Sequence, residues 1–408
     1  MTANAERLAE LQSAYDTYVD AELKLDLTRG KPSAQQLDLA NDLDGILGGF
    51  YLLQDGSDVR NYGGILGIPE ARALGADLLG VIPAQVMVGG NSSLTLMYQY
   101  IEHRLAAWRA VSPTVKFLCP VPGYDRHFTI CEHFGIEMIN VPINHDGPDM
   151  DVIEQLVTED ESIKGIWCVP KYSNPTGHTY PAQTVERFAA LPEKAGAGFQ
   201  IMWDNAYAVH DLEEDTVVLA NLLSLADAAG TSDQVAIFAS TSKITFAGAG
   251  IAFLATSATQ LGAFEKYLTA QMIGFDKVNQ LRHVRFLQDM DGIRAHMAKH
   301  RELIKPKFDL VLEKLDAALG GKELATWTRP SGGYFISLNT RPGIASRVVE
   351  MAGAAGVKLT PAGATFPYGK DPDNCNIRIA PTYPSIEELD KAMDVFVTCV
   401  ELVSLDTE

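Results

Sequence analysis

A lysine stands directly behind an apolar run that reads as a buried strand. Residues 235–239 read VAIFA, and Ser240, Thr241, Ser242 and Lys243 follow them. Because lysines are almost never buried without a partner, a lysine at this place among small hydroxyl side chains suggests chemistry at its amine. The alternative is an ordinary surface lysine, and this short stretch does not decide between the two.

Polar side chains also follow three other apolar runs. SNPTG spans residues 173–177, DNAY spans residues 204–207, and GGNSS spans residues 89–93 at the start of a helical pattern. In an open parallel sheet, ligands bind beyond the carboxyl ends of the strands. These three sets and Lys243 are therefore expected to share one site.

Each set has a plainer interpretation when it is taken alone. Asn91 and Ser92 at a helix N-terminus suit a phosphate, but Asn and Ser are also ordinary N-caps. Asp204 is either a carboxylate that keeps a ring nitrogen protonated or the cap of a following helix. Asn174 is either a ligand amide or part of a turn, since Asn-Pro and Gly are turn residues. Their coincidence at the strand ends of one sheet favours a shared ligand.

The elements that must hold these residues alternate along the chain. Short apolar runs between helical patterns predict βαβ units and a largely parallel sheet that is buried on both faces. These runs lie at residues 115–120, 137–142, 163–170, 199–204, 235–240 and 250–256.

The pattern changes from about Met290 onwards. A long helical stretch leads there into the alternating strands of GGYFISL and NIRIAP. We therefore expect a large domain (49–294) and a small C-terminal α+β domain (295–408), with an N-terminal segment (1–48) that is part of the small domain.

The composition narrows the class of protein. With 33 basic against 52 acidic residues and a net charge of −19, the chain should repel nucleic acid and membrane surfaces, so neither is expected as a partner. No apolar run is long enough to span a membrane, and the polar amphipathic start does not resemble a signal peptide. Five scattered cysteines without paired spacing argue against a disulfide framework or a zinc site. A cytoplasmic enzyme without a metal is expected.

One cofactor requires the whole set of residues. Pyridoxal phosphate has a phosphate, a pyridine nitrogen, a phenolic oxygen and an aldehyde that condenses with a lysine amine. SNPTG, DNAY and STSK, in this order and at these intervals, resemble the fold-type I aminotransferases of class I/II, the group that includes aspartate aminotransferase. The likeness runs from LTRGKP at Leu27 to NIRIAPTYPSIEEL. The residues around the motifs are most similar to those of an atypical bacterial branch of the aspartate aminotransferases.

The resemblance implies the fold and the roles of the reacting residues. The fold would be the α/β fold of type I pyridoxal-phosphate-dependent transferases, with a mostly parallel seven-stranded sheet in the large domain and a smaller α+β domain. Lys243 would form the Schiff base and move the proton at the substrate Cα, and Asp204 would pair with the pyridinium nitrogen. Asn174 and Tyr207 would bind the phenolic oxygen. Tyr124 would stack on the cofactor, although a packed core tyrosine is the plainer interpretation.

The phosphate-binding residues follow from the same resemblance. Asn91, Ser92, Ser240 and Ser242 would hold the phosphate, and Gly90 would allow its close approach. Most relatives carry an arginine about eight residues after the lysine, but this chain reads ITFAGAGIAF there, without a cation. The negative charge of the phosphate must then be stabilised by the helix dipole, by the serines or by a cation from elsewhere.

The resemblance also implies residues that bind the substrate and a second subunit. Arg378 would bind the α-carboxylate of the substrate; the alternative for this arginine is a structural ion pair. Asn174 and the backbone of Gly30 would lie beside the same carboxylate. Tyr62 would reach the phosphate of a neighbouring subunit, which makes the protein a homodimer with shared active sites. Arg282 is the preferred candidate for the distal carboxylate, and Arg29, Lys31, Lys277 and Arg285 are the alternatives.

The expected reaction is amino transfer from L-aspartate to 2-oxoglutarate by a ping-pong mechanism, with pyridoxal phosphate as cofactor. An alanine-type or kynurenine-type transaminase and a β-lyase remain as alternatives within the same cofactor class. A non-catalytic effector-sensing regulator is less expected, because such proteins carry a basic DNA-binding module and this chain is acidic. His127, His178 and His210 follow the motif segments and are expected as core or rim residues, since none has a partner at metal-ligand spacing.

Overall fold

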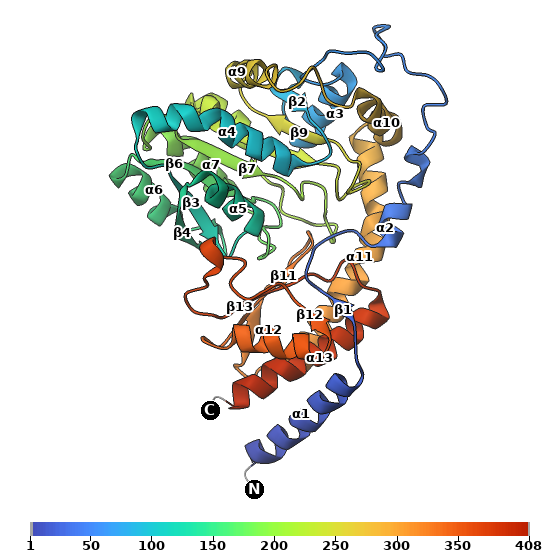
Figure 1. Cartoon of the computed structure of the whole chain (residues 1–408), viewed down its shortest axis with the longest axis vertical. Coiled ribbons are helices and arrows are strands. Elements are labelled where there is room, and N and C mark those ends of the chain that lie inside the picture. Colours follow the sequence, from blue (N-terminus) through green and yellow to red (C-terminus); the bar gives the residue numbers. More distant parts are fainter. Residues whose placement is uncertain (1–2, 407–408) are drawn as a thin grey trace.

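The computed structural model of the chain describes residues 3–406 as two lobes of unequal size (Figure 1). The larger lobe is built around one sheet with a hydrophobic core on each of its faces. The smaller lobe has a separate core around a three-stranded sheet.

The large sheet runs in the order β2-β9-β8-β7-β6-β3-β4-β5. Its central pairs from β8 through β7, β6 and β3 to β4 are parallel, whereas β2, β9 and β5 pair antiparallel with their neighbours. Its strands are β2 (Val86–Val88), β3 (Lys116–Val121), β4 (Glu137–Asn144), β5 (Gly147–Pro148), β6 (Ile163–Cys168), β7 (Gln200–Asp204), β8 (Val235–Ser240) and β9 (Ala252–Ala255).

The alternating pattern of short apolar runs is confirmed, and so is the mostly parallel sheet. The sheet has one strand more than the seven expected, because the two-residue β5 pairs with the end of β4 after the turn at Asn144–Gly147. Two residues carry too little apolar pattern to be recognised as a strand. The strand β8 is apolar from Val235 to Ala239 because helices cover both faces of the sheet.

Helices cover the two faces of the large sheet. The core on one face includes residues of α3 (Pro69–Leu79), α6 (Met150–Glu159), α7 (Ala182–Ala190), α8 (Leu222–Ala229) and α10 (Lys277–Leu287). The core on the other face includes α4 (Ser93–Val111), α5 (Asp125–Phe134) and α9 (Ala258–Leu268). Successive strand residues such as Trp203 and Met202 contribute to opposite cores, as the two-residue period of a strand requires.

The smaller lobe combines the C-terminal part of the chain with its beginning. Its three-stranded sheet has the order β10-β11-β13, and β1 pairs parallel with β12. These strands are β1 (Leu25–Asp26), β10 (Ala325–Trp327), β11 (Ile336–Thr340), β12 (Val357–Lys358) and β13 (Asn376–Ile379); the helices are α1 (Ala3–Asp20), α12 (Ala345–Ala354) and α13 (Ile386–Asp406). The short α2 (Ala34–Asp38) follows β1.

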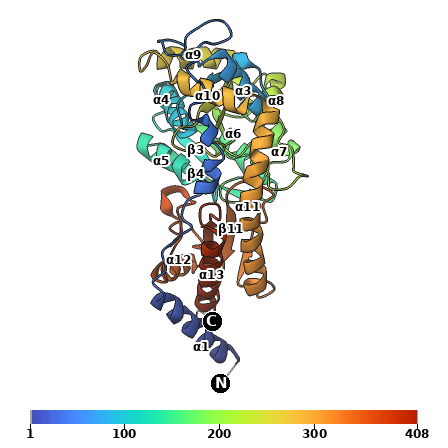
Figure 2. The ribbon, with the colours of Figure 1, turned by 90° about the vertical axis from the view of Figure 1, so that its right-hand side faces the viewer.

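One long helix connects the two cores. Helix α11 (Met290–Leu319) contributes Ile293 and Met297 to a core of the larger lobe, and its residues from Ile304 onwards belong to the core of the smaller lobe. Figure 2 shows this helix running along both lobes. The sequence-based domain boundaries stay predictions, and the one at 294/295 falls inside α11.

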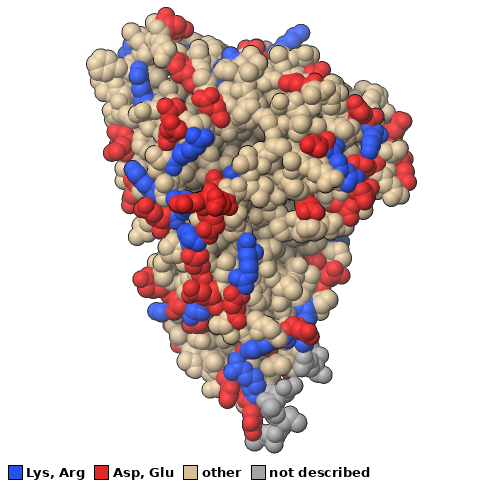
Figure 3. Space-filling view, turned by 180° about the vertical axis from the view of Figure 1, so that it is seen from behind, with Lys and Arg blue, Asp and Glu red and all other residues tan. Residues whose placement is uncertain are grey.

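Charged side chains of both signs occur on both lobes of the face shown in Figure 3, where they are intermingled. Within residues 3–406 no helix is long and apolar enough to cross a membrane, and all five cysteines are unpaired. The expected cytoplasmic location stays a prediction.

Candidate active site

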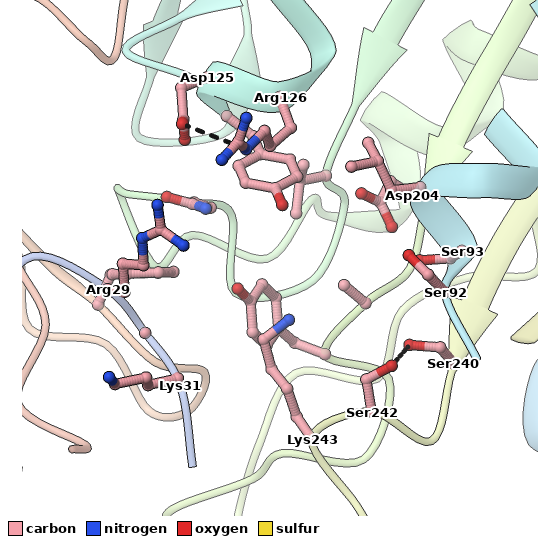
Figure 4. Close-up of a pocket in the computed structure, with 18 of the residues that line it drawn as sticks. Arg29, Lys31, Ser92, Ser93, Asp125, Arg126, Asp204, Ser240, Ser242 and Lys243 are labelled. Atoms are coloured by element: carbon pink, nitrogen blue, oxygen red, sulfur yellow. Dashed lines mark hydrogen bonds and ion pairs between the residues drawn. The ribbon is translucent and has the colours of Figure 1, made fainter. Parts of the chain in front are cut away.

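A cavity of about 860 Å³ lies where the carboxyl ends of β7 and β8 meet the smaller lobe and the N-terminal segment. Figure 4 shows part of its lining. Segments from across the chain contribute to it, so it forms only when both lobes are folded. Its polar residues and its one glycine are Thr28, Arg29, Gly30, Lys31, Asn91, Ser92, Ser93, Tyr124, Asp125, Arg126, Asn174, Asp204, Tyr207, Ser240, Ser242, Lys243, Thr360 and Arg378.

Lys243 reaches into this cavity from the turn after β8. Its Nζ lies 4.9 Å from the centre of the Tyr207 ring, and no acceptor within the described part of the chain lies within hydrogen-bond distance of it. Burial lowers the pKa of Lys243, while the Asp204 carboxylate opposes that shift. A lysine with a lowered pKa has a larger neutral fraction, and the neutral amine is the nucleophile.

The backbone behind Lys243 is held by buried side chains. The Nε2 atom of His210 donates to the Lys243 carbonyl at 3.3 Å, and the Nε2 atoms of His296 and His300 lie 2.7 and 3.0 Å from the Ile244 carbonyl. Burial, followed by the Lys243 charge, lowers the pKa of His210 to about 3, so this imidazole is neutral near pH 7. His210 is a core residue that positions the turn, as expected from the sequence.

Asp204 ends β7 with its carboxylate buried beside the cavity. Its Oδ2 lies 2.9 Å from Nε2 of His127, whose ring stacks on Trp167 at 4.2 Å between centres. Its Oδ1 is buried without a hydrogen-bond partner. An unpartnered buried carboxylate oxygen is costly, so this atom is a candidate contact for a ligand that can donate a proton.

Several serine hydroxyl groups line the cavity near the N-terminus of α4. Ser92 is the N-cap of α4, but its side chain makes no capping hydrogen bond. Ser240 Oγ donates to Ser242 Oγ at 3.1 Å, and Ser242 Oγ donates to the Asn91 carbonyl at 2.8 Å. Free hydroxyls and backbone N–H groups at a helix N-terminus suit an anion such as phosphate. In Figure 4 Arg29 and Lys31 lie across the cavity from Ser92 and Ser240.

Arg378 lies on β13 with its guanidinium at the smaller-lobe side of the cavity. Its side chain is 6% exposed, and Nη1 donates to Asn174 Oδ1 at 3.1 Å. Its guanidinium packs over the Phe335 ring at 4.9 Å. Gly30 lies against the same ring, since a Cβ at this residue would come within 2.4 Å of Phe335. A glycine is therefore required where the N-terminal segment crosses Phe335.

The structure brings together most of the residues singled out from the sequence. Burial raises the pKa of both Tyr124 and Tyr207, so both phenols are protonated near neutral pH. The residues that share the cavity lining are Gly30, Asn91, Ser92, Tyr124, Asn174, Asp204, Tyr207, Ser240, Ser242, Lys243 and Arg378.

Gly90, Tyr62 and Arg282, to which the resemblance gave a cofactor or substrate role, do not line this cavity. Gly90 lies one residue away, with Phe275 the nearest group to its Cβ position at 3.8 Å. Tyr62 is 83% exposed and borders a separate cavity of about 330 Å³. Arg282 is exposed on α10. The structure of one chain leaves the roles of Tyr62 and Arg282 as predictions.

Comparison with known proteins places the chain in a family. The sequence model of the aspartate amino-transferase family matches residues 1–408. The chain belongs to this family. Aspartate aminotransferase of Corynebacterium glutamicum is 47% identical over 416 residues, covering 99% of this chain and 96% of that protein. A protein of Mycolicibacterium smegmatis, described only in general terms as an aminotransferase, is 52% identical over 396 residues, covering 94% and 92% of the two chains.

A solved structure agrees with this assignment. The crystal structure of an aspartate transaminase from Corynebacterium glutamicum has a TM-score of 0.96 and 46% identity, covering 100% of this chain and 98% of that one. The protein is therefore an aminotransferase with the fold of type I pyridoxal-phosphate-dependent enzymes. Members of the aminotransferase family use pyridoxal phosphate.

The residues of this aminotransferase fit that cofactor at three separate places. The unpartnered Oδ1 of Asp204 suits a protonated ring nitrogen, the Nζ of Lys243 lacks an acceptor, and the hydroxyls at the start of α4 suit a phosphate. No group of three or more His, Cys, Asp or Glu residues in the described chain is arranged to hold a metal ion.

Sequence reasoning missed several residues that line the cavity of the aminotransferase. Asp125 and Arg126 come from the first turn of α5, and Thr360 donates its hydroxyl to the Thr28 carbonyl. His127 was recognised only as a core or rim residue, although it contacts Asp204. For Asp125, Arg126 and His127 the available signal was their place directly after Tyr124, within the same YDRH segment; no such signal pointed to Thr360.

Proposed function

We propose that this aminotransferase uses pyridoxal phosphate to convert L-aspartate and 2-oxoglutarate into oxaloacetate and L-glutamate by a ping-pong mechanism. The observation that carries the proposal is the shared cavity of Lys243, the unpartnered Asp204 Oδ1 and several arginines. Amine, buried carboxylate and guanidinium groups are the chemistry that an amino-acid substrate and this cofactor need.

The chain's own residues divide the work of the reaction. Pyridoxal phosphate, when bound, supplies an electron sink for the charge that develops at the substrate Cα. Lys243 Nζ attaches the cofactor and then moves the proton at Cα. The Asp204 carboxylate keeps the ring nitrogen protonated, and His127 orients that carboxylate at 2.9 Å. Arg378 binds the α-carboxylate of the substrate through its fork of N–H donors.

The remaining contacts position the cofactor. Ser92, Ser240 and the N-terminus of α4 bind the phosphate. Asn174 and Tyr207 bind the phenolic oxygen, and the buried Tyr124 packs against the ring. These contacts fix the orientation of the reacting bond, which is a large part of enzymatic rate enhancement.

A visible absorbance spectrum tests the proposed function. The purified protein with pyridoxal phosphate should show a yellow band that disappears on adding L-aspartate alone and returns with 2-oxoglutarate. A yellow band that ignores L-aspartate but responds to another amino acid would contradict the substrate assignment alone. A protein that develops no yellow band with pyridoxal phosphate would contradict the cofactor and the chemistry.

The distal carboxylate of L-aspartate needs a second cation, and Arg126 suits this role. Of the candidates considered from the sequence, Arg29 and Lys31 line the cavity, whereas Lys277, Arg282 and Arg285 do not. Arg126 lines it as well and has only the 4.0 Å contact of its Nε with Asp125 Oδ2 as an ion pair within residues 3–406. Lys31 is engaged with the Tyr383 ring at 3.8 Å.

The Arg126→Gln variant should raise KM for L-aspartate and 2-oxoglutarate by about 10–100-fold, since a charge-assisted hydrogen bond is replaced by a neutral one. Steady-state kinetics with both substrates measure the change, and L-alanine, which has no distal carboxylate, should be little affected. Arg29→Gln is the matched control, because it removes a guanidinium from the same cavity. A larger effect for Arg29→Gln would contradict the assignment to Arg126.

A homodimer with shared active sites is the assembly proposed for this enzyme. Large apolar side chains of the larger lobe are exposed: Phe50 is 78%, Tyr62 is 83% and Ile273 is 60% exposed. Tyr62 and Ile273 border the smaller cavity together with Phe275, the residue nearest to Gly90. A second copy of the chain would cover these side chains and bring its Tyr62 toward the phosphate.

Sedimentation of the purified protein should give twice the mass of the chain. Tyr62→Ala should stay dimeric but bind pyridoxal phosphate about tenfold more weakly, as expected for the loss of one hydrogen bond to a charged group. Ile82→Ala is a matched control, since Ile82 is also an exposed apolar residue of the larger lobe, at 59%. A fully active monomer would contradict the shared site.

A further inference from the structure

Asp125 places a carboxylate between two guanidinium groups of the cavity. Its Oδ1 lies 3.3 Å from Nη1 of Arg378, and its Oδ2 lies 4.0 Å from Nε of Arg126. Figure 4 shows Asp125 and Arg126 side by side at the start of α5. Within residues 3–406, Asp125 is the one carboxylate at ion-pair distance from Arg378. The residue thus neutralises the arginine that is proposed to bind the α-carboxylate.

The two partners of this ion pair differ in their access to water. The Arg378 side chain is 6% exposed, whereas the Asp125 side chain is 35% exposed. Asp125 can therefore turn toward solvent with little loss of hydration, while Arg378 cannot follow it. The separation of 3.3 Å is also longer than the usual 2.7–2.9 Å, roughly, of a charge-assisted hydrogen bond. Both features favour exchange of this carboxylate for another.

The other contacts of Arg378 do not satisfy its charge. Nη1 also donates to the Asn174 amide oxygen, and Nη2 donates to the Thr360 hydroxyl at 3.2 Å and to the Thr28 carbonyl at 3.5 Å, all of which are neutral acceptors. Its Nε is buried without a hydrogen-bond partner. A buried guanidinium with neutral acceptors and one displaceable carboxylate retains the capacity to bind an incoming carboxylate.

We infer that Asp125 is an internal counter-ion that competes with substrate and product carboxylates for Arg378 and Arg126. Asp125 then weakens the binding of every carboxylate ligand and speeds its release. In a ping-pong reaction the same cavity must release one oxo acid before it binds the next, so weaker product binding raises turnover when release is slow. This inference rests on the proposed function, and it makes Asp125 a positioning residue that acts through the two arginines.

Removing the charge of Asp125 should therefore tighten carboxylate binding. In Asp125→Asn holoenzyme, titration calorimetry with succinate should give a Kd about tenfold lower than in the unsubstituted enzyme, as expected for loss of a nearby like charge. Succinate has neither an amino nor an oxo group, so it binds without reacting. Propionate, with one carboxylate, should gain less than succinate, because Asp125 contacts both arginines. For L-aspartate, KM should fall and kcat should fall with it.

Two controls separate this inference from a structural role of Asp125. Asp151→Asn removes the same charge from the first turn of another helix, α6, where Asp151 pairs with Arg187 outside the cavity; its succinate Kd should not change. Asp125→Ser removes the charge with a smaller side chain and should tighten succinate binding as Asp125→Asn does. Thermal unfolding of each variant reports any general loss of stability.

An unchanged or higher succinate Kd in Asp125→Asn would overturn the inference, whatever the unfolding temperature. A variant with a lower unfolding temperature and an unchanged Kd would show that Asp125 only stabilises α5, which also overturns it. Failure of the proposed function is a separate outcome. In that case the unsubstituted holoenzyme transfers no amino group from L-aspartate, while the succinate titrations still measure the effect of Asp125.

Discussion

Replacement of Lys243 by alanine is expected to reduce amino transfer by at least about 10⁴-fold, because it removes both the nucleophilic amine and the general base. The Lys243 side chain lines the cavity, so its truncation should leave the hydrophobic cores intact and the variant should fold. Two measurements check this expectation: the rate of oxaloacetate formation from L-aspartate, and the visible absorbance of the protein with pyridoxal phosphate. The variant should lose both the turnover and the covalent attachment of pyridoxal phosphate to the chain.

Lys164→Ala is the matched control for this variant. Lys164 is also a mostly buried lysine of the larger lobe, but it lies on β6 and donates to the Ala197 carbonyl, outside the cavity. Its replacement should leave the absorbance band in place even where it lowers stability. Normal transamination by Lys243→Ala would refute the assignment of Lys243.

Replacement of Asp204 by asparagine should slow removal of the substrate Cα proton by about 10²–10⁴-fold, as expected when one partner of a buried, hydrogen-bonded charge pair is lost. Asparagine keeps the volume of the side chain and can still contact His127, which lies 2.9 Å from Asp204 Oδ2. The protonated ring nitrogen would lose its anionic partner at Oδ1. Exchange of the Cα proton with deuterated water, followed by nuclear magnetic resonance, measures the step directly.

Asp160→Asn serves as the control for Asp204→Asn. Asp160 pairs with Lys116 at 2.8 Å at the opposite end of the sheet, so the same change of charge is made away from the cavity. In this control the Cα proton of the substrate should exchange at the same rate as in the unsubstituted enzyme. If Asp204→Asn binds cofactor and exchanges the Cα proton at that rate too, Asp204 does not hold the ring nitrogen.

The long strands of the sheet and the polar residues at their ends could be predicted from the sequence alone. Apolar runs such as residues 235–239 specify buried parallel strands, because a strand covered on both faces has no polar side. The residues that follow such strands must meet at one edge of the sheet. Lys243, Asp204 and Asn174 could therefore be assigned to one site from local patterns and their order alone.

The tertiary structure decided which residues from distant segments complete the site. Asp125 and Arg378 are separated by 253 residues, and no periodic pattern or motif links the helix α5 to the strand β13. The resemblance already placed Gly30 in the site, but only the fold shows why it is a glycine: its contact with Phe335, and not its own backbone angles, excludes a Cβ. Such contacts depend on how the two lobes pack against each other.

Which cationic side chain lies near the distal carboxylate of the substrate also depends on the tertiary structure. Arg282 is preferred from the sequence and Arg29, Lys31, Lys277 and Arg285 stay open there, because a charged side chain on a helix or loop carries no signal of its neighbours. The fold places Arg29 and Lys31 in the cavity, adds Arg126 and leaves Arg282 exposed on α10. Long-range packing places each charge against its partners, and this information is absent from any short stretch of the chain.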